Sequence, residues 1–131
     1  MKHGIESAVG QVLVTVTEDM TARLDGVEIH PVYSTFWACY HAEVAARRAI
    51  EPFFEPDENA VGSHVAIDHK AMVAIGATLT VTAKVVRIEL NRILCTIVIS
   101  SNNSIIVATG SQEQVVLSSA KLQSLVARAC S

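Results

Sequence analysis

The sequence predicts an α+β fold in which a curled, five-stranded antiparallel sheet wraps one long central helix, with a short helix at the C-terminal end. Three observations lead to this fold class. One long segment, 34–50, is apolar on nearly every side of a helix. Alternating apolar and polar residues, which are typical of strands, occur mainly after that segment. All the aromatic residues lie in or beside it: Tyr33, Phe36, Trp37, Tyr40, Phe53 and Phe54.

The helix and the segments before it have recognisable boundaries. Residues 11–17 form a β-rich run that predicts a short first strand. The stretch 18–31 is polar, and we interpret it as a connecting loop. Ser34 is a suitable N-cap, and Pro52 stops a helix that reaches about Ile50. Because this helix is apolar all round, we expect it to be buried on every side.

Four strands are predicted after the helix, followed by a short helix from Ser118. In the first of these strands, alternation places His69 on the inward face with Val65 and Ile67. A change of the inward set near Val85 predicts a bulge in the second strand. The third and fourth strands form a hairpin. The expected strand ranges are 63–71, 78–88, 93–100 and 105–116.

The order of elements leaves one helix to be covered by one sheet. A lone apolar helix is covered only if the sheet curls around it, which is the hotdog architecture. A curled sheet of five strands has two free edges, and such edges commonly pair with a second copy of the chain. We therefore expect a homodimer, or a higher homo-oligomer, joined edge to edge.

The composition limits the class of protein. With 131 residues, 50% of them hydrophobic, the chain can form one domain, 1–131, with an apolar core. A net charge of −3 does not indicate nucleic-acid binding. A polar turn at 100–104 interrupts the longest uncharged stretch, so we expect no membrane span. Three cysteines without a CxxC pair, and no apolar leader, indicate a cytoplasmic location; we expect no metal site and no cofactor.

Polar residues that interrupt the apolar pattern are the candidates for chemistry. Glu43 lies within the apolar helix, where an unpaired carboxylate is costly, and an ion pair with Arg47 is the alternative explanation. His69 faces inward, either as a satisfied core histidine or as an acid–base group near Glu43. His41 lies on another side of the helix from Glu43, and we interpret it as structural.

Two further residues are candidates because of their positions. Thr35 begins the helix, where free N–H groups and the helix dipole favour a polar site, although a capping hydroxyl is common there. It lies about 12 Å along the helix axis from Glu43, too far for a direct bond. Gly62 precedes the strand of His69 and offers either a close backbone N–H or an ordinary turn.

Together these residues resemble a known family, the hotdog thioesterases of the fluoroacetyl-CoA thioesterase type. The similarity extends over roughly 33–117 and rests on His30–Trp37, Glu43, Val61–Ser63 and Ala66–His69. In that family a Thr at the helix start, a Glu, a Gly and a His at these spacings form the active site. The resemblance therefore implies an active site formed by Thr35, Glu43, Gly62 and His69.

Two departures from the pattern of that family concern the acyl group. Gln114, not an Arg, follows Glu113 near the end of the last strand, and the segment 25–32 is shorter and has no Phe. Both departures argue against a specificity for the fluoroacetyl group and leave the thioesterase chemistry in place.

The resemblance implies hydrolysis of an acyl-CoA or a similar acyl thioester to a carboxylic acid and a free thiol. Glu43 would attack the carbonyl or activate a water, His69 would transfer protons, Thr35 would orient a reacting group, and the Gly62 amide would stabilise the oxyanion. Two alternatives stay open: an enoyl-thioester hydratase or dehydratase, and a non-catalytic dimer that binds acyl-CoA or another small ligand.

Overall fold

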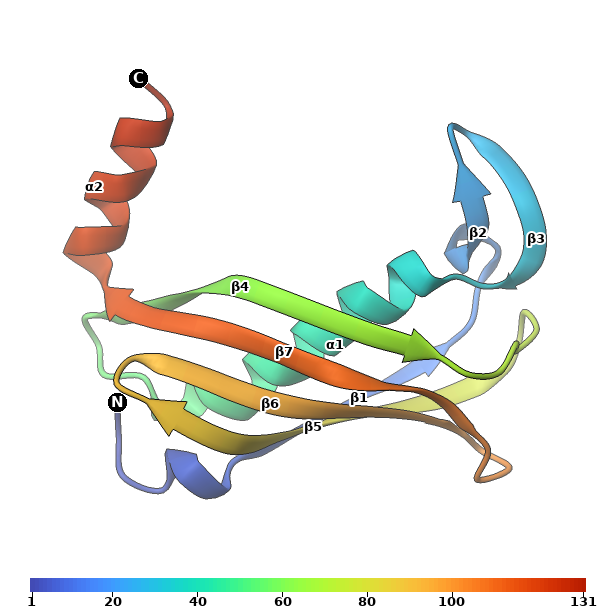
Figure 1. Cartoon of the computed structure of the whole chain (residues 1–131), viewed down its shortest axis with the longest axis horizontal. Coiled ribbons are helices and arrows are strands. Elements are labelled where there is room, and N and C mark those ends of the chain that lie inside the picture. The colour runs from blue at the N-terminus through green and yellow to red at the C-terminus, as the bar shows by residue number, and fades with distance from the viewer.

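The computed structural model describes residues 1–131 as a hotdog fold, with one long helix against a curled antiparallel sheet (Figure 1). The strands are β1 (Val9–Thr15), β2 (Thr21–Leu24), β3 (Val27–Tyr33), β4 (Glu58–His69), β5 (Thr78–Glu89), β6 (Arg92–Ser101) and β7 (Ile106–Ser118). The helices are α1 (Thr35–Ile50) and α2 (Ser119–Ala129), and three short 3-10 turns span Ile5–Ser7, Glu18–Met20 and Glu51–Phe53. The predicted fold class is therefore confirmed.

The main sheet has the strand order β1-β5-β6-β7-β4, and all neighbouring strands in it are antiparallel. α1 crosses its concave face and packs against β1, β5 and β4 (Figure 1). β1 and β4 are the two edges of this sheet. The core lies between α1 and the inward side chains of the strands, as the fully buried Leu79, Val81 and Ile97 indicate.

The helix begins where the sequence predicts, because the Ser34 side chain accepts a hydrogen bond from the Trp37 N–H. Its sheet-facing side consists mostly of alanines, which let the sheet approach closely; at Gly10 of β1, even a Cβ atom would collide with the helix backbone. The expectation that α1 is buried on every side is wrong for the single chain. Phe36 is 73% exposed and Tyr40 is 52% exposed, since the sheet covers only one side of the helix.

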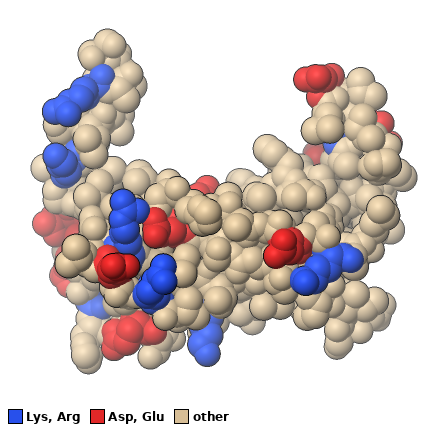
Figure 2. Space-filling model, in the orientation of Figure 1, with Lys and Arg blue, Asp and Glu red and all other residues tan.

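The segment 18–31, expected to be a loop, instead carries the β2–β3 hairpin. Asp25 and Gly26 both have positive φ angles (52° and 77°), which suits a tight hairpin turn. Hydrogen bonding of Tyr33 N–H to the Val73 carbonyl fixes the base of the hairpin to the body of the protein. The hairpin and α2 project from opposite ends of the sheet on the side of the β4 edge (Figure 1), with a hollow between them (Figure 2).

The later strands agree with the sequence in detail. The predicted bulge in β5 is confirmed by a register shift between Val85 and Arg87, and the β6–β7 hairpin turns at 102–104. Ser118 caps α2 by accepting from the Lys121 N–H. β4 starts at Glu58, earlier than expected, and contains an additional register shift between Gly62 and His64. No helix combines the length and apolar character that crossing a membrane requires.

Candidate active site

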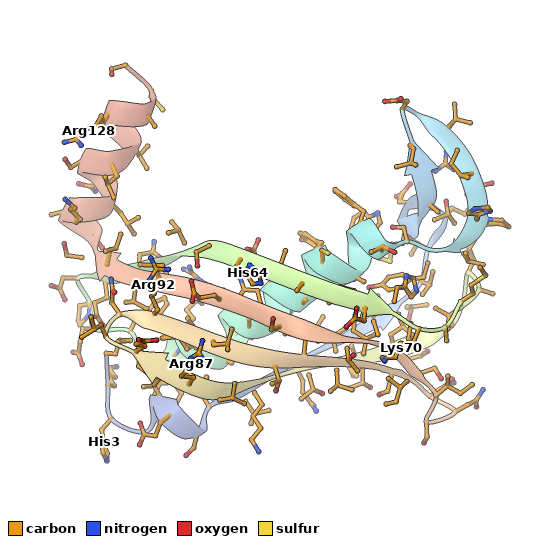
Figure 3. The ribbon with its side chains drawn as sticks, in the orientation of Figure 1. His3, His64, Lys70, Arg87, Arg92 and Arg128 are labelled. Carbon is orange, nitrogen blue, oxygen red and sulfur yellow. The ribbon has the colours of Figure 1, made fainter.

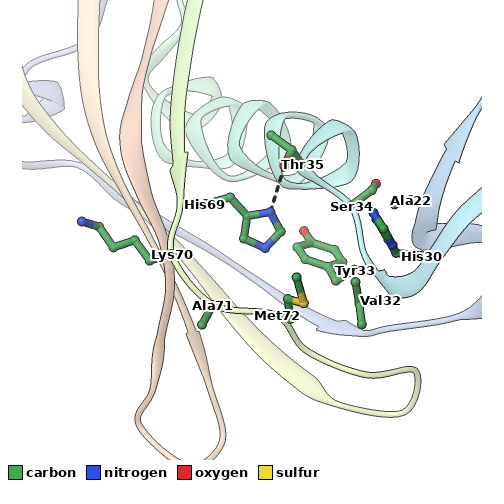
Figure 4. A pocket seen from close by; sticks show the side chains of 10 residues that line it. All are labelled: Ala22, His30, Val32, Tyr33, Ser34, Thr35, His69, Lys70, Ala71 and Met72. Atoms are coloured by element: carbon green, nitrogen blue, oxygen red, sulfur yellow. Dashed lines mark hydrogen bonds between the residues drawn. The ribbon is translucent and has the colours of Figure 1, made fainter.

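Thr35 and His69 meet at the N-terminal end of α1. The Thr35 hydroxyl oxygen lies 2.9 Å from His69 Nδ1, which joins the first residue of α1 to the last residue of β4 (Figure 4). His69 Nε2 is buried and has no hydrogen-bond partner. Both residues line a cavity of about 320 Å³ under the β2–β3 hairpin, together with His30, Lys70 and Met72. The cavity is thus lined by an imidazole that has one ring nitrogen bound to Thr35 and the other without a partner.

The ring of Tyr33 packs against the His69 ring. Tyr33, fully buried, meets His69 edge to face, with ring centroids 6.2 Å apart. The Tyr33 hydroxyl lies 2.7 Å from His41 Nδ1. Burial lowers the pKa of His41 and raises the pKa of Tyr33, so that the imidazole is neutral and the phenol keeps its proton at neutral pH. His41 is thus buried and bonded to Tyr33, and the structural role expected from the sequence stays a prediction.

Glu43 lies further along α1, against the inner face of β4. Gln112 Nε2 of β7 donates to Glu43 Oε1 at 3.2 Å. The same carboxylate oxygen occupies the space that a Cβ atom at position 62 would require, so Gly62 is needed for this approach. Glu43 and Gly62 line a second cavity of about 440 Å³ with Tyr40, Arg48 and others.

The ion pair of Glu43 with Arg47 is not formed. Arg47 donates instead to Glu51 (Nε to Oε2, 2.7 Å), to Asn59 and to the Ala60 carbonyl. The burial of Glu43 expected from the sequence is also wrong, because its side of α1 is exposed in the single chain. The carboxylate is therefore a solvent-accessible group whose hydrogen-bond partner in the protein is a neutral amide.

A bulge in β4 brings Gly62 to the same face as His69. The two residues are seven positions apart, so in a regular strand they would face opposite sides. The register shift between Gly62 and His64 changes this, since Gly62 lies opposite Gln114 while His69 lies opposite Ala108. The bulged Ser63 donates its hydroxyl to Glu113 Oε1 at 2.6 Å, and Arg92 (Figure 3) donates to the same oxygen at 2.7 Å.

Gln112 is a site residue that the sequence pattern did not reveal, and Gln114 was notable there only as a departure from the family. Both are buried, 0% and 3% exposed, on the inner face of β7. The signal was present in the sequence: alternation back from Val116, an inward residue, places both glutamines among the core positions.

The four predicted site residues thus form two pairs within one chain. Thr35 contacts His69, Glu43 contacts Gly62, and each pair lines a different cavity. Both pairs border the exposed edge strand β4. The two pairs place an imidazole and a hydroxyl in one cavity and a carboxylate in the other, and these are groups that acid–base or nucleophilic catalysis of acyl transfer uses.

Comparisons with known proteins show which proteins share this fold. With a TM-score of 0.91, the structure resembles a hypothetical protein of Thermus thermophilus described as a thioesterase superfamily member; the two are 33% identical over 94% of this chain and 90% of that one. A variant of the fluoroacetyl-CoA-specific thioesterase FlK has a TM-score of 0.84 at 23% identity, covering 97% and 98% of the two chains. A hot-dog-like protein from Thermanaerovibrio acidaminovorans also has a TM-score of 0.84 at 23% identity, covering 93% and 90%. No curated protein matches the chain.

The fold and the likeness to the Thermus protein define a member of the hotdog thioesterase class. More specifically, residues 16–120 match the model of the FlK family, the fluoroacetyl-CoA-specific thioesterases, and the chain belongs to that family. The protein is accordingly a thioester hydrolase. Among the alternatives that the sequence left open, this membership favours hydrolysis over hydration and over ligand binding alone.

Proposed function

We propose that the protein hydrolyses an acyl-CoA, or a similar acyl thioester, with Glu43 and His69 as its catalytic residues. The observation that carries this proposal is the placement of the Thr35–His69 pair and the Glu43 carboxylate on the helix-facing side of one edge strand. Thr35 orients His69 through its 2.9 Å contact. The Gly62 amide stabilises the negative oxygen that forms at the thioester carbonyl, a contribution of about 3 kcal/mol.

Glu43 has two possible parts in this reaction. As a nucleophile, its carboxylate oxygen adds to the carbonyl carbon, the C–S bond breaks, and water then hydrolyses the resulting anhydride. As a general base, Glu43 removes a proton from a water whose oxygen adds to the carbonyl carbon before the C–S bond breaks. In either route His69 delivers a proton to the departing thiolate, so the products are a carboxylic acid and a free thiol.

A homodimer joined through β4 would complete this site. Antiparallel pairing of β4 with the same strand of a second copy, centred between Val65 and Ala66, would bring Gly62 near the partner's His69. Glu43 of one chain and the Thr35–His69 pair of the other would then face one substrate. The exposed apolar side chains of Phe36, Tyr40 and Val65 beside this edge support such a contact.

The proposal is tested by measuring thiol release from short, long, branched, aryl and fluorinated acyl-CoAs. Glu43→Gln and His69→Ala are expected to abolish turnover while leaving a folded dimer, as measured by circular dichroism and light scattering. Arg87→Gln, on the exposed outer part of β5, is the control and should keep wild-type turnover. Full activity in either the Glu43 or the His69 variant would exclude these catalytic roles.

A further inference from the structure

Gln112 occupies an unusual place for a polar side chain. It lies on the inner face of β7, opposite Val65 of β4, and it is 0% exposed. The neighbouring residues on the same face of β7 are Gly110 and Gln114. This part of the strand therefore contributes no aliphatic side chain to the core. A buried amide needs partners for both of its polar ends.

Only one end of the Gln112 amide has a partner. Nε2 donates to Glu43 Oε1 at 3.2 Å, whereas the amide oxygen is buried without any hydrogen bond. If the Gln112 amide were flipped, its oxygen would face the Glu43 carboxylate, and both groups are acceptors. The carboxylate of Glu43 therefore determines which way the Gln112 amide points. Leaving a buried acceptor unpaired is unfavourable for folding, and an apolar side chain of the same size would avoid it.

The contact selects one position for the Glu43 carboxylate. A Cβ atom at position 62 would lie 3.2 Å from Gln112 Nε2 and would overlap Glu43 Oε1, so this oxygen lies against the glycine beside the amide. Arg47, which lines the same cavity, is already bound to Glu51 and Asn59. The carboxylate is thus held by a neutral donor, and it forms no ion pair with either arginine of its cavity, Arg47 or Arg48.

We propose that Gln112 is a positioning residue for the reaction: it anchors Glu43 Oε1 over Gly62 so that Oε2 faces the substrate carbonyl or the attacking water. This inference rests on the proposed function of Glu43. It predicts that an apolar residue at position 112 lowers kcat without lowering the stability of the fold. Replacing a residue with a purely structural role would not have this effect.

The first experiment replaces the amide by an apolar chain of similar length. In Gln112→Met we expect kcat for thiol release to fall about 100-fold, as for a reacting group displaced by about 1 Å. KM should stay near the wild-type value, and the melting temperature should be unchanged or higher. Gln112→Leu gives the same test if the Met variant does not fold. Gln123→Met, the same exchange on the exposed surface of α2, is the matched control and should leave all three quantities unchanged.

The second experiment asks whether Gln112 acts through Glu43. Residual thiol release is measured for Glu43→Gln, alone and combined with Gln112→Met, at high enzyme concentration. If Gln112 only positions Glu43, the second substitution has no further effect on the residual rate. A further fall of the same size as in the wild-type background would overturn the proposal.

The outcomes separate this inference from the proposed function. Full turnover in Glu43→Gln would refute the catalytic role of Glu43 itself. Loss of turnover in Glu43→Gln with wild-type kcat in a folded Gln112→Met would leave that role standing and refute the positioning role of Gln112. A lower melting temperature together with a proportional loss of active protein, at unchanged kcat per folded molecule, would also refute it.

Discussion

In a Gly62→Ala variant, the added methyl group would occupy the space that the Glu43 carboxylate fills. Gly62 does not have a positive φ angle, so alanine is compatible with the backbone there. The obstructing atoms belong to the free end of a flexible side chain, which can withdraw. The carboxylate must move on the order of 1 Å, and a displacement of that size can reduce turnover about 100-fold. The backbone N–H at position 62 is retained, so the loss would come from Glu43 and not from the oxyanion contact.

The free energy of unfolding should change little in the same variant. Alanine is favoured over glycine in a strand by about 0.5–1 kcal/mol, which offsets the cost of moving Glu43. Gly110→Ala is the matched control, because its new methyl group would collide with the backbone oxygen of Ala66, which cannot withdraw. We expect Gly110→Ala to lose about 1–3 kcal/mol in urea unfolding. Wild-type kcat in a folded Gly62→Ala protein would refute this reasoning.

Three further predictions concern Ser34, Thr35 and His41, at the start of α1 and within it. Thr35→Ala removes the contact to His69 and should lower kcat, whereas Thr35→Ser keeps the hydroxyl and should restore most of it in the thiol-release assay. Ser34→Ala removes the N-cap of α1 and should cost about 1 kcal/mol of unfolding free energy in urea titrations, with kcat unchanged if the cap is only structural. Burial lowers the pKa of His41, so the folded protein favours the neutral imidazole. The resulting contribution to the free energy of unfolding is complete above about pH 6.5 and is lost as the pH falls through the lowered pKa. Melting temperatures between pH 7 and pH 5 should therefore fall less steeply in His41→Gln than in the wild type, and an identical slope would show that another group titrates.

Local signals account for the parts of the fold that the sequence predicted correctly. The Ser34 cap, the bulge near Val85 and the β6–β7 hairpin each depend on neighbouring residues and on one buried face. The β2–β3 hairpin was missed because most of its residues are exposed on both faces, which leaves no apolar alternation to detect. Its turn signal, Asp25–Gly26, was present in the sequence.

The inward direction of His69 could be predicted because the second half of β4 is regular from His64 onward. The face on which Gly62 lies could not be predicted, because one bulged residue, Ser63, reverses the alternation of faces between Gly62 and His69. Helix spacing offered an ion pair of Glu43 with Arg47 as the alternative explanation, but Arg47 binds Glu51 and a residue of the neighbouring strand, Asn59.

By itself, the sequence determined the hotdog architecture and four residue types at spacings that match a thioesterase family, because apolar periodicity and spacing are properties of neighbouring residues. Only the tertiary structure decided which of those residues touch. It paired Thr35 with His69, and it placed Glu43 over Gly62 beneath the amide of Gln112, which is 69 residues away in the chain. Contacts between distant segments depend on strand register and on a single bulge, and neither is visible in the local pattern of the sequence.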